Sequence, residues 1–167
     1  MSSMDQSRLT NQRYHTRLAL LSDITQIVAA VCSLRAELRG VTSVEATPEA
    51  EDVCRRIIEG RSSGAIFVAC AEDQRLVGIV TLSIQEAIRV GGSYGLIQEL
   101  WVHPEHRSNA VGARLIEAVE DYCRKEGHGN IEVGLPGRSF PQHQQTYNFY
   151  QRCGFVEQGP RMRKVNK

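Results

Sequence analysis

The sequence predicts a single domain of the α+β (mixed α/β) class, in which helices flank a mostly antiparallel sheet. Two amphipathic helical patterns come first along the chain, and three strand patterns joined by short turns follow them. A helix and a further strand come next, which predicts a βαβ unit with two parallel strands. A chain of 167 residues can bury one core without disulfides or metals.

The charge balance excludes some classes of partner. Lys plus Arg total 20 and Asp plus Glu total 19, which gives a net charge of +1 and argues against nucleic acid or a membrane surface as a partner. No apolar run reaches the length of a membrane-spanning helix, and the N-terminus lacks the apolar centre of a secretory signal. We therefore expect a cytoplasmic protein with a flexible N-terminal arm (1–15) and one domain (16–167).

The cysteine and histidine residues do not form a metal-binding pattern. His103 and His106 are three residues apart, but no acid or cysteine cluster accompanies them, so we predict no metal site. The cysteines lie in apolar periodic segments without CxxC spacing, so we expect buried, reduced thiols. They are Cys32, Cys54, Cys70, Cys123 and Cys153.

The first half of the chain combines strands with two helices. Apolar residues three and four apart predict helices at 24–38 and 48–58, which end at Gly40 and Gly60. Thr47-Pro48-Glu49 gives the second helix a cap, a proline in its first position and an acid in its first turn. Strands are predicted at 17–21, 65–71 and 76–84.

The second half of the chain contains a longer alternation of strand and helix. Helices are predicted at 110–125 and 142–153, each followed by a glycine that ends it. Strands are predicted at 97–102 and 131–135, and weak strand patterns occur at 155–156 and 162–165.

The stretch from Ile97 to Leu115 joins a strand, a loop and a helix. Pro104 keeps the residue before it out of helical geometry and so ends the strand. The helix that follows presents unpaired backbone N–H groups and the positive end of its dipole, which makes the loop a candidate anion site. The candidate residues are Arg107, Ser108, Asn109, Ala110, Val111 and Gly112.

Two motifs and the element order β-α-α-β-β-β-α-β-α-β resemble the GCN5-related N-acetyltransferases (GNAT). The first motif, V-x-P-x-x-R-x-x-G-x-G, is similar to residues 102–112, where Ala110 replaces the first glycine. The second, Y-x-x-x-G-F, is met by Tyr150 to Phe155. The resemblance implies the GNAT fold, a central sheet of six to seven strands flanked by four helices. It also implies an enzyme that uses acetyl-CoA.

The resemblance implies how acetyl-CoA would bind. The loop 107–112 would hold the pyrophosphate, while the backbone of Leu100, Trp101 and Val102 would bind the pantetheine arm in place of a neighbouring strand. A backbone N–H near Val102 would polarise the thioester carbonyl. Ala110 would cost about 1–2 kcal/mol in a left-handed conformation and nothing in a right-handed one. We expect the right-handed conformation.

Glu99 and Tyr150 are the predicted catalytic residues. Glu99 is the only acid on its apolar strand and could remove a proton from the attacking amine, although it could also be purely structural. Alternation places Gln98 and Glu99 on opposite faces unless a bulge intervenes, and the sequence reveals no bulge. By its place in the second motif, Tyr150 would protonate the leaving sulfur; the alternative is a core aromatic residue.

The acceptor of the acetyl group carries no motif. Its walls would come from the first two helices and from the loops at 86–93 and 136–142. We expect direct transfer to a primary amine of a small molecule such as a polyamine, an amino acid or an antibiotic. The alternatives are a protein N-terminus or lysine, or a sensor that binds acyl-CoA without turnover. A homodimer is possible.

Overall fold

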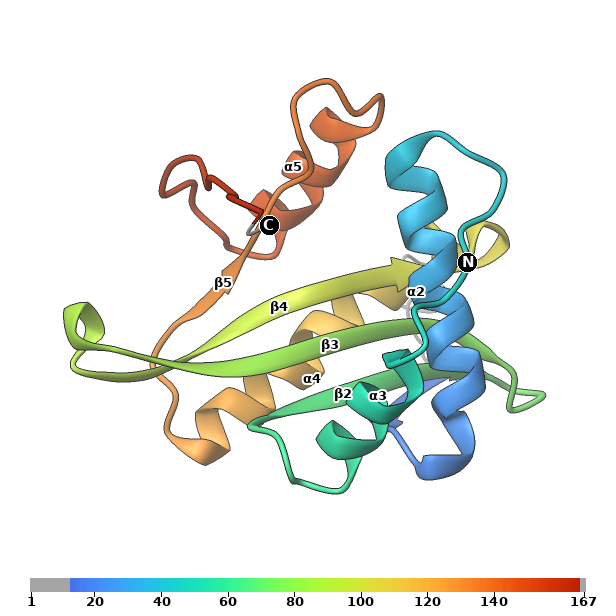
Figure 1. Cartoon of the computed structure of the whole chain (residues 1–167), viewed down its shortest axis with the longest axis horizontal. Helices are drawn as coiled ribbons and strands as arrows, with labels where there is room; N and C mark the ends of the chain where they lie inside the picture. Colours follow the sequence, from blue (N-terminus) through green and yellow to red (C-terminus); the bar gives the residue numbers. More distant parts are fainter. Residues whose placement is uncertain (1–12, 166–167) are drawn as a thin grey trace, which may run out of the picture.

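The computed structural model describes residues 13–165 and shows a five-stranded sheet with helices on both faces (Figure 1). The strands are β1 (Tyr14–Leu18), β2 (Gly64–Ala71), β3 (Leu76–Ala87), β4 (Gly92–Val102) and β5 (Ile131–Val133). The helices are α2 (Ile24–Arg39), α3 (Ala50–Ile58), α4 (Val111–Glu126) and α5 (His143–Arg152). Short 3-10 turns lie at Leu21–Asp23, Ile88–Val90 and Pro104–His106.

The sheet has the strand order β1-β2-β3-β4-β5. Neighbours from β1 to β4 are antiparallel, and β4 and β5 are parallel. In Figure 1, α2 and α3 lie in front of the sheet and α4 crosses behind it on the way from β4 to β5. The predicted fold class, the meander, the βαβ unit and the four flanking helices are confirmed.

Two hydrophobic cores lie on the two faces of the sheet because side chains alternate along each strand. On β2, Ile66 and Val68 are buried against α2 and α3. Phe67 and Ala69, which lie between and beyond them, are buried in the core that contains α4. The sequence of β2 is therefore an almost continuous apolar run, as expected for a strand covered on both faces.

The number of strands is lower than the six to seven predicted. Residues 155–156 and 162–165 form no strand. In the first segment Phe155 packs beside Tyr150 while Val156 is 77% exposed, and in the second segment Met162 is 100% exposed. A strand pattern needs a partner strand to become a strand, and within the described residues neither segment pairs with one.

The first strand begins earlier than predicted. β1 starts at Tyr14, so the expected boundary after residue 15 falls inside this strand; residues 1–12 of the expected arm lie outside the described part. The chain turns away from the sheet at Leu20 because the Asp23 carboxylate accepts the Leu20 N–H at 2.7 Å. Arg17 donates to the same carboxylate at 2.7 and 3.0 Å, and this ion pair lowers the pKa of Asp23.

All five cysteines are free thiols. Three of them, Cys54, Cys70 and Cys123, are buried as expected, whereas Cys32 and Cys153 are only partly buried. Burial raises the pKa of Cys54 to about 11, so this thiol stays protonated and unreactive at neutral pH.

Within residues 13–165, no helix combines the length and apolar character that would let it cross a membrane.

Gly95 allows β4 to pass close beneath α4. A Cβ atom at this position would lie 2.9 Å from the Cys123 sulfur and 3.0 Å from Leu82 Cδ1. We expect Gly95→Ala to lower the free energy of unfolding by about 1–3 kcal/mol, because it overpacks a filled core. Urea denaturation would measure the change. Adding Cys123→Ala should recover part of the loss, since it removes the sulfur; strictly additive losses would contradict this packing.

Candidate active site

A β-bulge interrupts β4 at Gln98. Glu99 pairs with Thr81 and Ile97 pairs with Leu82, so Gln98 has no partner on β3. Its effect is visible in the packing, because Trp101 lies in the core with α2 while Ile97 lies in the core with α4. Without the extra residue, these two side chains would share one face of the strand.

The bulge places Gln98 and Glu99 on the same face of the sheet. The Thr81 hydroxyl donates a hydrogen bond to Glu99 Oε2 and accepts one from the Glu99 N–H at 3.1 Å. Gln98 Nε2 donates to the Ser83 hydroxyl at 2.9 Å. Thr81 and Ser83 are two residues apart on a regular part of β3 and therefore point the same way. The bulge is the exception to strict alternation that the sequence analysis left open, and it puts both side chains on one face.

β4 and β5 separate just before this bulge. β5 pairs only with Gly95, Leu96 and Ile97, although β4 continues to Val102. Figure 1 shows β5 leading toward α5 while the end of β4 runs toward α2. The backbone edge of Leu100–Val102 that faces away from β3 therefore has no strand partner in the described part. This is the edge to which the family resemblance assigns the pantetheine arm, and that role stays a prediction.

Ala110 adopts the left-handed conformation, so the expected right-handed one is wrong. Its φ and ψ are 59° and 11°, and Ser108 also has a positive φ of 63°. Asn109, between them, donates to the carbonyl groups of His106 and Arg107 at 3.3 and 3.0 Å. The loop thus reverses through two left-handed residues. Of the two glycine positions in the motif, one holds a residue with a Cβ atom, Ala110, and the other holds Gly112.

The first turn of α4 has no side-chain cap within the described residues. Its leading N–H groups, from Val111 to Ala113, have no acceptor inside the helix. They lie at the positive end of a 16-residue helix. Such N–H groups can bind a phosphate or pyrophosphate, which is the role predicted for the loop 107–112.

Arg107 ties the loop to two other elements. Its Nη2 donates to both carboxylate oxygens of Glu37, at 2.7 and 2.8 Å, and its Nε donates to the Val102 carbonyl at 2.9 Å. The Trp101 indole N–H donates to the same carboxylate at 3.0 Å. Glu37 therefore connects the end of α2, the end of β4 and the loop. Within residues 13–165 the Nη1 of Arg107 has no hydrogen-bond partner.

Tyr150 is buried on α5 between two aromatic rings. The ring centroids of Phe149 and Phe155 lie 5.2 and 5.4 Å from that of Tyr150. Burial raises the pKa of Tyr150 above its ordinary value, with a smaller contribution from Cys153. Its hydroxyl makes no hydrogen bond within the described part of the chain, so it is available to a ligand.

α5 packs directly on the first turn of α4. A Cβ on Gly112 would lie 3.2 Å from two ring atoms of Phe149, so glycine gives the Phe149 ring room to approach. The two motifs thus meet in space, although about forty residues separate them in sequence. Glu99 lies on β4 and Tyr150 lies on α5. Within residues 13–165, no hydrogen bond joins these two residues.

Three residues at this site, Thr81, Ser83 and Glu37, were not predicted from the sequence. Thr81 and Ser83 are alternate polar residues in an otherwise apolar strand, and that pattern could have marked them. Glu37 gives no such signal, because its contacts with Trp101 and Arg107 span 64 and 70 residues.

A sheet that opens between two parallel strands, beside an uncapped helix N-terminus, is the arrangement of an acyl-CoA-dependent acetyltransferase. The chain belongs to the acetyltransferase (GNAT) family, whose model matches residues 30–155. It is therefore a GNAT-type N-acetyltransferase, a family that generally uses acetyl-CoA.

Curated relatives are similar over part of the chain. Aminoglycoside N(6')-acetyltransferase type 1 of Stenotrophomonas maltophilia is 26% identical over 115 residues, which are 66% of this chain and 72% of the relative. IAA acetyltransferase of Azospirillum brasilense is 32% identical over 77 residues, which are 44% of this chain and 46% of the relative.

Solved structures share the fold at low identity. A possible acetyltransferase from Clostridium difficile 630 has a TM-score of 0.74 and 15% identity, covering 93% of this chain and 98% of its own. An aminoglycoside acetyltransferase from an uncultured soil metagenomic sample, in complex with sisomicin, has a TM-score of 0.74 and 14% identity, covering 94% and 99%. These likenesses concern the fold alone.

The left-handed Ala110 leads to a stability prediction. We expect Ala110→Gly to raise the free energy of unfolding by up to about 1 kcal/mol, because glycine removes a Cβ penalty of about 1–2 kcal/mol. The greater freedom of glycine in the unfolded chain offsets part of that gain. Ala113→Gly, inside α4, is the matched control and should cost about 1 kcal/mol. Equal losses in the two variants, measured by chemical denaturation, would contradict the strained conformation.

Proposed function

We propose that this enzyme transfers the acetyl group of acetyl-CoA to a primary amine of a small molecule. The observation that carries the proposal is the end of β4, which loses β5 after Ile97 and then leads into the loop and the N-terminus of α4. The aminoglycoside acetyltransferase relative, which covers two thirds of this chain, supports a small-molecule acceptor.

Two parts of the chain would hold acetyl-CoA, which supplies the acetyl group as a thioester. The backbone edge of Leu100–Val102 that faces away from β3 would hydrogen-bond the pantetheine arm, apart from the Val102 carbonyl, which Arg107 Nε already binds. The Val102 N–H would stabilise charge on the thioester oxygen. The N–H groups that open α4, together with Arg107 Nη1, would hold the pyrophosphate. Ser108, Asn109 and Ala110 shape the loop between them.

Glu99 is the proposed general base. Its carboxylate is held by the Thr81 hydroxyl through Oε2, so Oε1 remains for a proton acceptor role. Glu99 lies on the strand that would carry the thioester, one residue before the proposed pantetheine edge. It would remove a proton from the amine directly or through one water before attack.

Tyr150 is the proposed donor to the leaving sulfur. Because burial raises its pKa, the phenol stays protonated across the range in which amines are acetylated. A donor with so high a pKa stabilises a thiolate mainly through its hydrogen bond, and the proton can follow from solvent.

Thiol release in the presence of acetyl-CoA and a panel of amines tests this function. Turnover with small amines supports it, whereas turnover only with peptide N-termini or lysine side chains would move the acceptor to proteins. Thermal stabilisation by acetyl-CoA without thiol release from any amine would indicate a sensor rather than an enzyme for this site.

Replacing Glu99 tests the base. We expect Glu99→Gln to lower kcat at neutral pH by about 10²–10⁴-fold, because the amide cannot accept the proton. The matched control is Glu117→Gln, an exposed acid on α4, which should keep the parent rate. Steady-state kinetics below pH 8 would show the difference, and an unchanged rate in Glu99→Gln would reject the assignment.

Thr81 should act on the rate through Glu99. We expect Thr81→Val to lower kcat by about tenfold, because the carboxylate loses its hydrogen-bond donor, while Thr81→Ser keeps most of the rate. In the Glu99→Gln background, Thr81→Val should have no further effect on kcat. A full additional loss in that double variant would show that Thr81 acts independently of Glu99.

Tyr150→Phe tests the donor to sulfur. We expect kcat to fall by about 10²-fold with little change in acetyl-CoA binding. Since burial raises the pKa of Tyr150, the parent enzyme should show no loss of rate from this group up to about pH 10. Tyr147→Phe, one turn earlier on α5, is the control. Full turnover by Tyr150→Phe would exclude the role.

A further inference from the structure

A row of polar side chains begins where helix α2 stops covering the sheet. Ile79 and Trp101 are buried against α2, whereas Thr81, Ser83 and Gln85 follow on the same face of β3. Ser83 and Gln85 are partly exposed and Gln98, beside them on β4, is exposed. Figure 1 shows the β3–β4 hairpin continuing past α2 toward its tip. The row therefore lies open to a ligand next to Glu99.

The hydrogen bonds of Ser83 fix the orientation of two glutamine side chains. The Ser83 hydroxyl donates its proton to the Leu96 carbonyl at 3.4 Å. It accepts from Gln98 Nε2 at 2.9 Å and from Gln85 Nε2 at 3.2 Å. A hydroxyl has one proton and two lone pairs, so it is fully used. Since both amides donate to Ser83 through Nε2, both amide oxygens point away from this hydroxyl.

This orientation leaves a surface that only accepts hydrogen bonds. Within the part of the chain that the structure describes, the amide oxygens of Gln85 and Gln98 accept no hydrogen bond. Glu99 Oε1 is likewise without a donor, because Thr81 binds Oε2. Successive levels of this row lie about 7 Å apart, the rise of two residues along a strand. A ligand that fits the row must therefore bring donors at that spacing.

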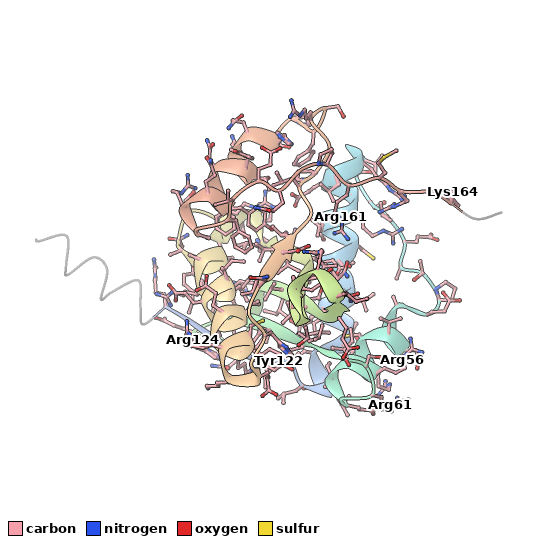
Figure 2. All side chains as sticks on the ribbon, turned by 90° about the vertical axis from the view of Figure 1, so that its left-hand side faces the viewer. Arg56, Arg61, Tyr122, Arg124, Arg161 and Lys164 are labelled. Atoms are coloured by element: carbon pink, nitrogen blue, oxygen red, sulfur yellow. The ribbon has the colours of Figure 1, made fainter. Side chains whose placement is uncertain are left out.

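The charges around the row favour a neutral donor beyond Glu99. Glu132 on β5 is already paired with Arg89 at 2.6 Å. Arg161 of the C-terminal segment reaches the end of β5, since its Nη1 would lie 3.6 Å from a Cβ on Gly134. Figure 2 shows this segment, with Arg161 and Lys164 labelled, passing from α5 toward the side of the sheet where α2 lies. Because Glu132 is already paired with Arg89, it offers no free charge to a second ammonium group, and a hydroxyl is the donor that the neutral amide oxygens match.

We propose that Ser83, Gln85 and Gln98 form an acceptor subsite that selects amines carrying a hydroxyl group about 7 Å from the reacting nitrogen. Amino alcohols and amino sugars share this chemistry. The subsite rests on the proposed acetyl transfer at Glu99 and names the class of amine that this site takes. Glu99 binds the amine, and the amide oxygen of Gln98 accepts a hydrogen bond from the hydroxyl group of the same ligand.

Three amines of equal chain length test the subsite by thiol release from acetyl-CoA: pentylamine, aminopentanol and cadaverine. We expect kcat/KM for aminopentanol to exceed that for pentylamine by about fivefold or more, the worth of one hydrogen bond. Cadaverine should fall below aminopentanol. Equal values for pentylamine and aminopentanol, or a preference for cadaverine over aminopentanol, would overturn the subsite.

Variants assign the selectivity to residues. Gln98→Met keeps the length of the side chain but removes the amide oxygen that accepts the hydrogen bond. The ratio of kcat/KM for aminopentanol to kcat/KM for pentylamine should therefore fall close to one. Ser83→Ala should lower the ratio too, because it frees both amides to turn. Gln26→Met, at an exposed position on α2, should keep the parent ratio. A parent-like ratio in Gln98→Met would overturn the proposal.

Failure of the subsite and failure of the acetyl transfer would give different results. Turnover of all three amines at one rate rejects the subsite and keeps the acetyl transfer. An absence of thiol release with every amine rejects the acetyl transfer and the subsite with it.

Discussion

The unpaired residue Gln98 in β4 is the constraint on which the site depends. One extra residue reverses the faces of the strand, so that Ile97 serves the core under α4 and Trp101 serves the core under α2. It also brings two polar side chains, Gln98 and Glu99, side by side where strict alternation would bury one of them. β5 leaves β4 at the residue before the bulge, so the open backbone edge and the polar face begin at the same point. A regular β4 would give neither.

The sequence predicted those elements whose ends are determined locally. α2 and α4 agree with their apolar periodicity to within one or two residues, because Gly40 and Gly127 end them in the left-handed conformation, at φ of 65° and 80°. The two ends of the sheet were predicted less well. β1 ends just before Asp23 accepts the Leu20 N–H, and the C-terminal strand patterns pair with no strand of the described sheet; both outcomes depend on tertiary partners.

The candidate site divides in the same way. Local motifs located the loop before α4 and the Tyr150 turn of α5, and their contact through Gly112 and Phe149 explains why both occur in one chain. The bulge left no trace in residue types, because an extra residue in a strand changes pairing rather than composition. The right-handed conformation expected for Ala110 is wrong because the loop reverses through a left-handed residue at this position, which an otherwise intact motif does not reveal.

Glu37 holds the loop to the rest of the fold through Arg107. It pairs with Arg107 at the surface, where side-chain exposures of 36% and 45% make such a pair worth no more than about 1 kcal/mol. The same carboxylate also accepts from the Trp101 indole, and Arg107 also donates to the Val102 carbonyl, so the pair belongs to a network that joins three elements. With the charge of Arg107 already balanced by Glu37, the positive potential of the loop comes mainly from the backbone N–H groups of α4. The proposed anion binding at this end of β4 would therefore depend on backbone geometry, to which the left-handed Ala110 contributes.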